Sequence, residues 1–226
     1  MTPLNLTELI DHTLLKPTAT TEDIHNLCEE AEKYQFHSVC VSPCFVSLAR
    51  GLLKQSQIVV TTVIGFPMGY NTSHIKKMEA RNAIARGAAE LDIVINGGFL
   101  KEGKDSSIKN EIEDILTLSS NIIYKIIVET SLLTDPEKKR AAQLIIETGA
   151  DFVKTSTGFF ASGASFEDVC LLKKTVQDKI KIKAAGGIKD FQIAYKMVQC
   201  GANRIGSSNS IKIFTECLKS ESINSY

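Results

Sequence analysis

The stretch Glu90-Leu-Asp-Ile-Val-Ile-Asn96 carries the pattern that decides the fold. Its apolar and polar side chains alternate with a period of two, so they point to opposite faces of a short strand. The face that suits a layer of helices holds Leu91, Ile93 and Ile95. The face that turns inward holds Asp92, Val94 and Asn96. The stretch is therefore a strand that packs against helices on one side.

Short β-branched and apolar runs of this kind recur along the whole chain. Amphipathic stretches separate them at intervals of ~20 to 35 residues, as successive βαβ units require. We expect strands at residues 9–15, 37–42, 59–65, 90–96, 124–130, 152–155, 181–185 and 204–206. Helix starts are indicated at residues 20–23, 135–136 and 165–168, helix ends at Gly87, Gly149 and Gly201, and a last helix at 210–218.

Eight strand–helix units in 226 residues favour a closed ring of strands over a doubly wound sheet. No GxGxxG sequence follows the first expected strand, as it would in a dinucleotide-binding fold. The prediction is an α/β protein with a TIM-type (β/α)8 barrel as one catalytic domain over residues 1–226, including a short polar tail at 219–226.

The composition excludes several classes of protein. The 26 basic and 26 acidic side chains leave no net charge, so no global field favours nucleic acid or an anionic membrane. No leader-like N-terminus or membrane-length apolar run is present, which predicts a cytoplasmic protein. The six cysteines are expected to be reduced thiols, and the four histidines show no metal-binding pattern. We therefore expect no metal site.

Two lysines and one aspartate break the apolar pattern of the expected strands. Lys154 lies near the end of the sixth strand, Lys183 lies on the inward face of the seventh, and Asp92 lies on the inward face of the fourth. A single lysine of this kind can also be a rim residue that reaches solvent or pairs with a carboxylate. Burying all three charges in one barrel costs several kcal/mol per ion, so together they indicate a site.

This trio suits Schiff-base chemistry. A lysine must lose its proton before its amine attacks a carbonyl, and its ordinary pKa of about 10.4 leaves little free amine at neutral pH. Burial and the neighbouring charge of Lys183 are expected to lower the pKa of Lys154, which makes Lys154 the nucleophile. Asp92 is placed to move protons.

Glycines occur where a barrel builds its phosphate site. Gly186 and Gly187 follow the seventh strand, and Gly206 and Ser208 follow the eighth, just before the last helix. Gly158, which follows the sixth strand, is expected to form a third side of this phosphate site. The alternative is that these glycines only make tight turns.

Over residues 9–211 the sequence resembles the deoxyribose-phosphate aldolase family. The matching motifs occur in the family's order: Ile10-Asp-His-Thr-Leu-Leu-Lys-Pro17, Ser38-Val-Cys-Val-Ser-Pro43, Val63-Ile-Gly-Phe-Pro67, Glu90-Leu-Asp-Ile-Val-Ile-Asn96, Val153-Lys-Thr-Ser-Thr-Gly158, Lys183-Ala-Ala-Gly-Gly187 and Arg204-Ile-Gly-Ser-Ser208. The resemblance implies reversible cleavage of 2-deoxy-D-ribose 5-phosphate to glyceraldehyde 3-phosphate and acetaldehyde, in deoxyribose or deoxynucleoside catabolism. It also implies a homo-oligomer, a dimer or higher.

The resemblance assigns roles residue by residue. Lys154 forms the Schiff base, Asp92 and Lys183 donate and accept protons, and no cofactor is implied. It places Asp11, Thr13 and Cys40 in the substrate pocket, although a strand cysteine such as Cys40 also suits inert packing. Phosphate binding is assigned to Gly158, Gly186, Gly187, Gly206 and Ser208.

The sequence departs from the family pattern at Phe159, Phe160 and Asn209. By default the polar end of the chain is a frayed terminus. Because some relatives end in tyrosine, Tyr226 is also a candidate proton relay, and in that case its deletion is expected to slow turnover. Two rival functions stay open: another Schiff-base phosphosugar aldolase or transaldolase, and a catalytically silent phosphosugar-binding barrel.

Overall fold

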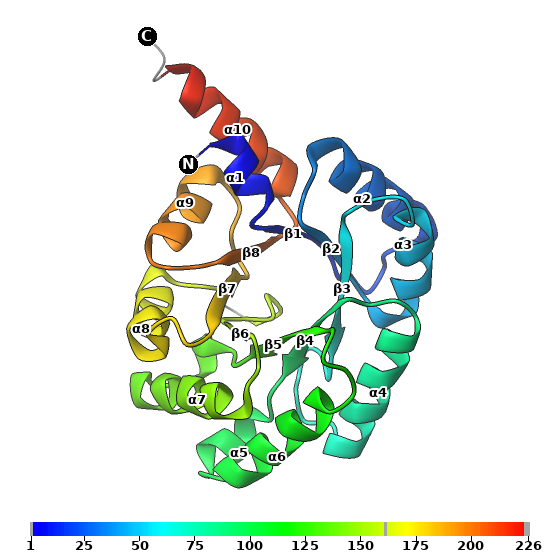
Figure 1. The fold of residues 1–226 in the computed structure, drawn as a ribbon. Helices are drawn as coiled ribbons and strands as arrows, with labels where there is room; N and C mark the ends of the chain where they lie inside the picture. The colour runs from blue at the N-terminus through cyan, green and yellow to red at the C-terminus, as the bar shows by residue number, and fades with distance from the viewer. Residues whose placement is uncertain (1, 161, 224–226) are drawn as a thin grey trace.

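The structure, a computed structural model, describes residues 2–160 and 162–223. Eight parallel strands form a closed barrel in chain order, with β8 hydrogen-bonded to β1 (Figure 1). The strands are β1 (Ile10–Leu14), β2 (Ser38–Val41), β3 (Val59–Ile64), β4 (Glu90–Val94), β5 (Ile123–Ile127), β6 (Phe152–Lys154), β7 (Lys181–Ala185) and β8 (Arg204–Ser207). This confirms the predicted TIM-type barrel.

Helices surround the strands as an outer ring (Figure 1). They are α1 (Pro3–Thr7), α2 (Thr21–Tyr34), α3 (Val46–Leu52), α4 (Ser73–Ala85), α5 (Gly97–Lys101), α6 (Asp105–Leu116), α7 (Asp135–Thr148), α8 (Phe166–Val176), α9 (Phe191–Gln199) and α10 (Ser210–Ile223), with short 3-10 turns η1 (Pro43–Phe45) and η2 (Thr130–Leu132). No helix in the described part of the chain is long and apolar enough to cross a membrane.

The predicted helix signals act as local chemistry requires. Thr20 caps α2 through a capping box with Asp23, and the Ser165 side chain accepts a hydrogen bond from the backbone N–H of Asp168 at the start of α8. Gly149 ends α7 in the left-handed conformation, with φ of 81°. One boundary was wrong: the last helix, expected at 210–218, continues to Ile223, so residues 219–223 of the predicted polar tail are helical.

The strand alternation divides the buried residues into two sets. Leu91, Ile93, Val153 and Ile182 belong to the apolar core between the strands and the helices. The side chains between them in sequence point into the barrel, as the period of two requires. The barrel interior therefore receives the polar side chains of the strands.

Candidate active site

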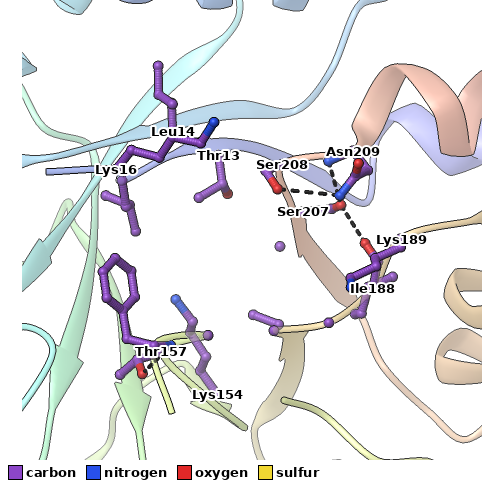
Figure 2. A pocket seen from close by; sticks show the side chains of 17 residues that line it. Thr13, Leu14, Lys16, Lys154, Thr157, Ile188, Lys189, Ser207, Ser208 and Asn209 are labelled. Atoms are coloured by element: carbon purple, nitrogen blue, oxygen red, sulfur yellow. Dashed lines mark hydrogen bonds between the residues drawn. The ribbon is translucent and has the colours of Figure 1, made fainter. Parts of the chain in front are cut away.

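A cavity of about 380 Å³ opens at the carboxyl ends of the strands (Figure 2). Segments that follow β1, β6, β7 and β8 form its wall. The lining residues are 13–16, 154, 157–159, 185–189 and 206–209. The site thus lies at the end of the barrel where α/β barrels place their chemistry.

Lys154 reaches this cavity from inside the barrel. It is the last residue of β6, and its side chain is only 4% exposed. Its Nζ atom donates a hydrogen bond to Oδ2 of Asp92, at 2.7 Å; Asp92 lies on β4, two strands away in the barrel. Figure 2 shows its amine pointing into the space enclosed by the lining residues. Lys154 is therefore placed to meet a ligand in the cavity.

Lys183 lies beside Lys154, because the two residues are register partners on β7 and β6. The Nζ atom of Lys183 lies 2.6 Å from Oδ2 of Asp92 and 2.5 Å from Oδ2 of Asp11. All three predicted chemical residues, Lys154, Lys183 and Asp92, thus meet at one carboxylate. Their assigned roles remain predictions.

The two lysines differ in how the barrel treats their charge. Burial lowers the pKa of Lys154, and the positive charge of Lys183 lowers it further, against the opposing attraction of Asp92. Burial also disfavours the charge on Lys183, but Asp11 and Asp92 outweigh it and raise the pKa of Lys183. Of the pair, Lys154 therefore gives up its proton first, in agreement with the direction expected from the sequence.

Asp92 is held as an anion. Burial by itself raises the pKa of a carboxyl group, but Lys125, Lys154 and Lys183 together hold the pKa of Asp92 well below its usual range. Its two oxygens bind different lysines. Oδ1 accepts a hydrogen bond from Lys125 at 2.9 Å, and Oδ2 accepts hydrogen bonds from Lys154 and Lys183. The carboxylate is thus a hydrogen-bond acceptor with a negative charge, fixed in position beside Lys154.

Three interior charges were missed by the sequence reasoning. Lys125 on β5, which is fully buried, lies 2.6 Å from Oε2 of Glu90. Arg204 on β8 donates from Nη1 to Asp11 at 2.8 Å and to Glu90 at 3.2 Å. The available signal was the alternation Ile123, Lys125, Ile127, which places Lys125 on the inward face of its strand.

One group of possible metal ligands occurs within residues 2–160 and 162–223. Asp11, His37 and Glu90 bring their ligand atoms within 4.8 Å of one another. The guanidinium of Arg204 already bonds both carboxylates of this group. A divalent cation would have to displace that guanidinium, so this donor set fits arginine better than a metal ion.

The glycine loops at the cavity have backbones that a larger residue would strain. Gly158, Gly186 and Gly187 have φ of 82°, 90° and 74°. A Cβ atom on Gly163 would lie 2.1 Å from the carbonyl oxygen of Gly186, so two loop backbones touch there. These loops expose backbone to the cavity, as a bound phosphate requires.

The loop after β8 leads directly into α10, and it is held by its own hydrogen bonds. Ser207 donates from Oγ to the carbonyl oxygen of Ile188 at 2.7 Å, and the backbone N–H of Asn209 donates to Ser207 Oγ at 2.9 Å (Figure 2). Lys16 and Lys189 also line the cavity and supply positive charge that the sequence reasoning did not assign.

The remaining predicted residues divide into three groups. Thr13, Gly158, Gly186, Gly187, Gly206 and Ser208 line the cavity as expected. Asp11 and Cys40 do not: both side chains are buried inside the barrel, and Asp11 is occupied by Lys183 and Arg204. Burial raises the pKa of the Cys40 thiol to about 11, which fits inert packing. Tyr226 lies outside the described residues.

Two of the three sequence departures, Phe159 and Asn209, line the cavity, whereas Phe160 does not. Phe159 lines the cavity and packs edge to face against Phe66, with ring centroids 5.1 Å apart. Asn209 lines it too, immediately before α10. An aromatic ring therefore occupies part of the rim next to the glycine loop at residue 158.

Comparison with known proteins identifies the family. Residues 6–215 match the DeoC/LacD family of aldolases. A deoxyribose-phosphate aldolase from Geobacillus sp. (strain WCH70) is 50% identical over 210 residues, 92% of this chain and 94% of that protein. One from Thermoanaerobacter pseudethanolicus (strain ATCC 33223 / 39E) is 49% identical over 216 residues, 94% of this chain and 97% of that protein.

Solved structures agree. The tetrameric deoxyribose phosphate aldolase from Aeropyrum pernix superposes with a TM-score of 0.90 at 33% identity, covering 97% of this chain and 93% of that one. An aldolase called QR15 gives a TM-score of 0.92 at 39% identity, covering 96% and 98%. On this evidence, the chain belongs to the DeoC/LacD family of aldolases.

Proposed function

We propose that this chain is a class I, Schiff-base aldolase that reversibly cleaves 2-deoxy-D-ribose 5-phosphate to D-glyceraldehyde 3-phosphate and acetaldehyde. The observation that carries the proposal is the geometry at Lys154: a buried amine with a lowered pKa opens into a cavity and lies 2.7 Å from a carboxylate. The names of the 47–50% identical relatives support the choice of substrate.

The reaction begins at the aldehyde carbon of the open-chain sugar. The free amine of Lys154 attacks C1, and the carbinolamine formed loses water to give a protonated imine. Proton transfers to and from the departing oxygen need a group within hydrogen-bond reach, a role we assign to Asp92 and Lys183. The positive iminium nitrogen then attracts electrons from the neighbouring bonds.

Cleavage breaks the bond between C2 and C3. The hydroxyl on C3 loses its proton and becomes the aldehyde of glyceraldehyde 3-phosphate, while the bonding electrons move into the iminium and leave an enamine. Protonation of the enamine at C2 and hydrolysis of the imine release acetaldehyde and restore the amine. Because the iminium is the electron sink, these steps balance without a cofactor.

The same wall of the cavity suits the phosphate. Backbone at Gly158, Gly186 and Gly187 can approach an anion closely, because no side chain intervenes. Lys16 and Lys189 supply positive charge near it on a chain that has no net charge. We therefore assign these residues, with Gly206 and Ser208, to phosphate binding.

Borohydride trapping tests the proposal. The protein is incubated with deoxyribose 5-phosphate, reduced, digested and analysed by peptide mass spectrometry, with Lys154→Met as the control. We expect one stable adduct, on the peptide that contains Lys154, and none in the variant. An adduct at Lys183 alone would reverse the two roles. Binding of the sugar phosphate without adduct or turnover would favour the silent binding barrel.

A donor panel distinguishes the remaining rival. In the synthetic direction we expect acetaldehyde to serve as donor with glyceraldehyde 3-phosphate as acceptor. If longer ketose donors react and acetaldehyde does not, the chain is a different phosphosugar aldolase or a transaldolase.

We also propose that the chain works in the cytoplasm as a homo-oligomer. None of its six cysteines, all of which lie within the described residues, forms a disulfide, which fits a reducing compartment. Exposed apolar side chains gather on α4 and the loop before it, at Met68, Tyr70, Ile75 and Met78. The relative from Aeropyrum pernix is a tetramer. Size-exclusion chromatography with light scattering tests the proposal, and a monomeric mass at assay concentration would contradict it.

A further inference from the structure

The polar interior of the barrel is one continuous set of ion pairs, which we call the interior charge cluster. Among the described residues it joins three carboxylates to four basic groups through pairs of 3.2 Å or less. The members are Asp11, Glu90 and Asp92, and Lys125, Lys154, Lys183 and Arg204. All seven side chains are 10% exposed or less. Water therefore screens these charges poorly.

The cluster does not balance when every member is ionised. Four positive charges face three negative ones, which leaves one positive charge in excess within a buried space. The cluster becomes neutral if one lysine loses its proton. An excess charge of this kind is costly in a low-dielectric interior, so the cluster as a whole favours release of one proton.

The arrangement of contacts decides which group releases it. Lys183 forms ion pairs with two carboxylates, Asp11 and Asp92, and Arg204 likewise forms ion pairs with Asp11 and Glu90. Lys125 also bonds two, Glu90 and Asp92. Lys154 bonds a single carboxylate oxygen, which it shares with Lys183, and it borders the cavity. Lys154 is thus the cation with the fewest compensating partners.

Lys125 occupies the key position in this arrangement. It takes Oδ1 of Asp92, the oxygen opposite the one that holds Lys154, and links Asp92 to Glu90 on the same strand. Without Lys125, the negative charge of Asp92 would act more fully on Lys154 and favour its protonated form. Within residues 2–160 and 162–223, Lys125 does not line the cavity, and its ion pairs are with Glu90 and Asp92.

We propose that Lys125 is a positioning residue: by occupying the far oxygen of Asp92 and completing the interior charge cluster, it makes Lys154 the group that sheds its proton. Glu90 and Arg204 set the balance with it from the amino-terminal half of the barrel. The inference rests on the proposed function, because it concerns the nucleophile of that reaction.

Other charged or titratable groups face this region from the surrounding elements. They are Cys40 on β2, His37 just before β2, Glu129 just after β5, and Lys16 and Lys189 at the cavity. His37 reaches the cluster through Glu90, at 3.0 Å, and its side chain is 31% exposed. The carboxylate of Glu129 accepts hydrogen bonds from the backbone N–H and the hydroxyl of Thr157. None of them lies between Lys125 and Asp92, which are in direct contact.

The test measures when Lys154 becomes a free amine. Acetaldehyde and borohydride are added over a series of buffers from acidic to alkaline pH, and the initial rate of adduct formation on the Lys154 peptide gives a midpoint pH. The variants are Lys125→Met, Lys125→Arg, Glu90→Gln and the double variant Lys125→Met/Glu90→Gln. Lys109→Met, which removes one charge from an exposed pair with Glu147, is the matched control. Circular dichroism and thermal melting establish that each variant is folded.

The expected shifts have opposite signs. Lys125→Met removes a positive charge, so the midpoint moves up by about one pH unit and trapping at neutral pH slows about tenfold. Glu90→Gln removes a negative charge and moves the midpoint down. The double variant returns close to the wild-type midpoint, because the charge count is restored. Lys125→Arg, which keeps the charge, and the surface control leave the midpoint in place.

A folded Lys125→Met with an unmoved midpoint would overturn the inference, as would a double variant that keeps the full upward shift. If Lys125→Met does not fold, Glu90→Gln decides: an unmoved or raised midpoint overturns the inference, and a lowered one supports it. The proposed function fails separately, when the wild-type protein forms no adduct on Lys154 at any pH.

Discussion

Lys154 and Lys183 are register partners on adjacent strands, and their Nζ atoms share a single acceptor oxygen. Two ammonium groups held at one oxygen repel each other, and the surrounding carboxylates determine which proton is retained. Lys183 retains its proton because it has a second carboxylate, Asp11, at 2.5 Å. The pair therefore separates into one charged lysine and one candidate nucleophile.

Removing the charge of Lys183 should impair this separation. In Lys183→Met the pKa of Lys154 rises, because a neighbouring cation is lost and Asp92 is left to favour the protonated amine. We expect turnover to fall by about a hundredfold or more and the acidic limb of the pH–rate profile to move to higher pH. Lys181→Met removes the same charge from the exposed start of β7 and serves as the control. An unchanged profile in Lys183→Met would contradict the assignment.

Lys189 should distinguish phosphorylated from unphosphorylated sugars. In Lys189→Met a positive charge at the cavity wall is lost, so KM for deoxyribose 5-phosphate should rise about tenfold, equivalent to about 1.4 kcal/mol. KM for deoxyribose itself should stay the same. Steady-state kinetics with both sugars make the measurement, with Lys196→Met on the outer surface of α9 as the control. Equal changes for both sugars would argue against a phosphate contact.

Gly163 tests the close approach of the two loops at the cavity. An added Cβ would lie 2.1 Å from the carbonyl oxygen of Gly186, so Gly163→Ala must push the loop after β7 away from its place. We expect KM for the sugar phosphate to rise several-fold and the free energy of unfolding to fall by about 1 to 3 kcal/mol. Gly97→Ala, where nothing lies within 4 Å of the new atom, should behave like wild type. A wild-type KM in Gly163→Ala would show that the loop after β7 can move without any effect on binding of the sugar phosphate.

The acid stability of the barrel should depend on Glu90. Burial raises the pKa of Glu90, but Lys125, a hydrogen bond from His37 and Arg204 outweigh it and lower the pKa to about 2 from the ordinary 4.5. Because the folded-state pKa is the lower one, ionised Glu90 stabilises the fold above pH 4.5, and this contribution is lost as the pH falls towards 2. The loss is on the order of 3 kcal/mol.

Urea unfolding at several pH values between these limits measures that contribution. In Glu90→Gln the free energy of unfolding should fall less steeply with decreasing pH than in wild type, while the exposed Glu113→Gln should follow wild type. Parallel curves for wild type and Glu90→Gln would mean that other groups control acid unfolding.

The sequence was sufficient to predict which strand side chains point into the barrel, because this depends on the period of two alone. A strand residue has only two faces to choose from, and the apolar neighbours Leu91, Val153 and Ile182 assign the face that packs against helices. The inward direction of Asp92, Lys154 and Lys183 follows from this choice and is confirmed. Helix starts at Thr20 and Ser165 were predictable for a similar reason, because a cap is a local interaction.

The height of a side chain inside the barrel was not predictable in the same way. Asp11 was expected in the pocket, but the β1–β8 register places it opposite Gly206, within reach of Arg204. Such a register depends on how eight tilted strands close, which no single segment encodes. Lys125 was missed because Ile123 and Ile127 share its face and make that face resemble ordinary core.

The closing strand has a consequence for how the protein is made. Arg204, which neutralises Asp11 and Glu90, lies on β8, near the end of the chain, whereas both of its partners lie on strands that leave the ribosome much earlier. Until residues 204–207 have been synthesised, the nascent chain lacks both the last edge of the ring and this counter-charge. Burying the carboxylates of Asp11 and Glu90 without Arg204 would be costly, so these side chains stay hydrated until β8 is available. The barrel therefore closes only after β8 has emerged.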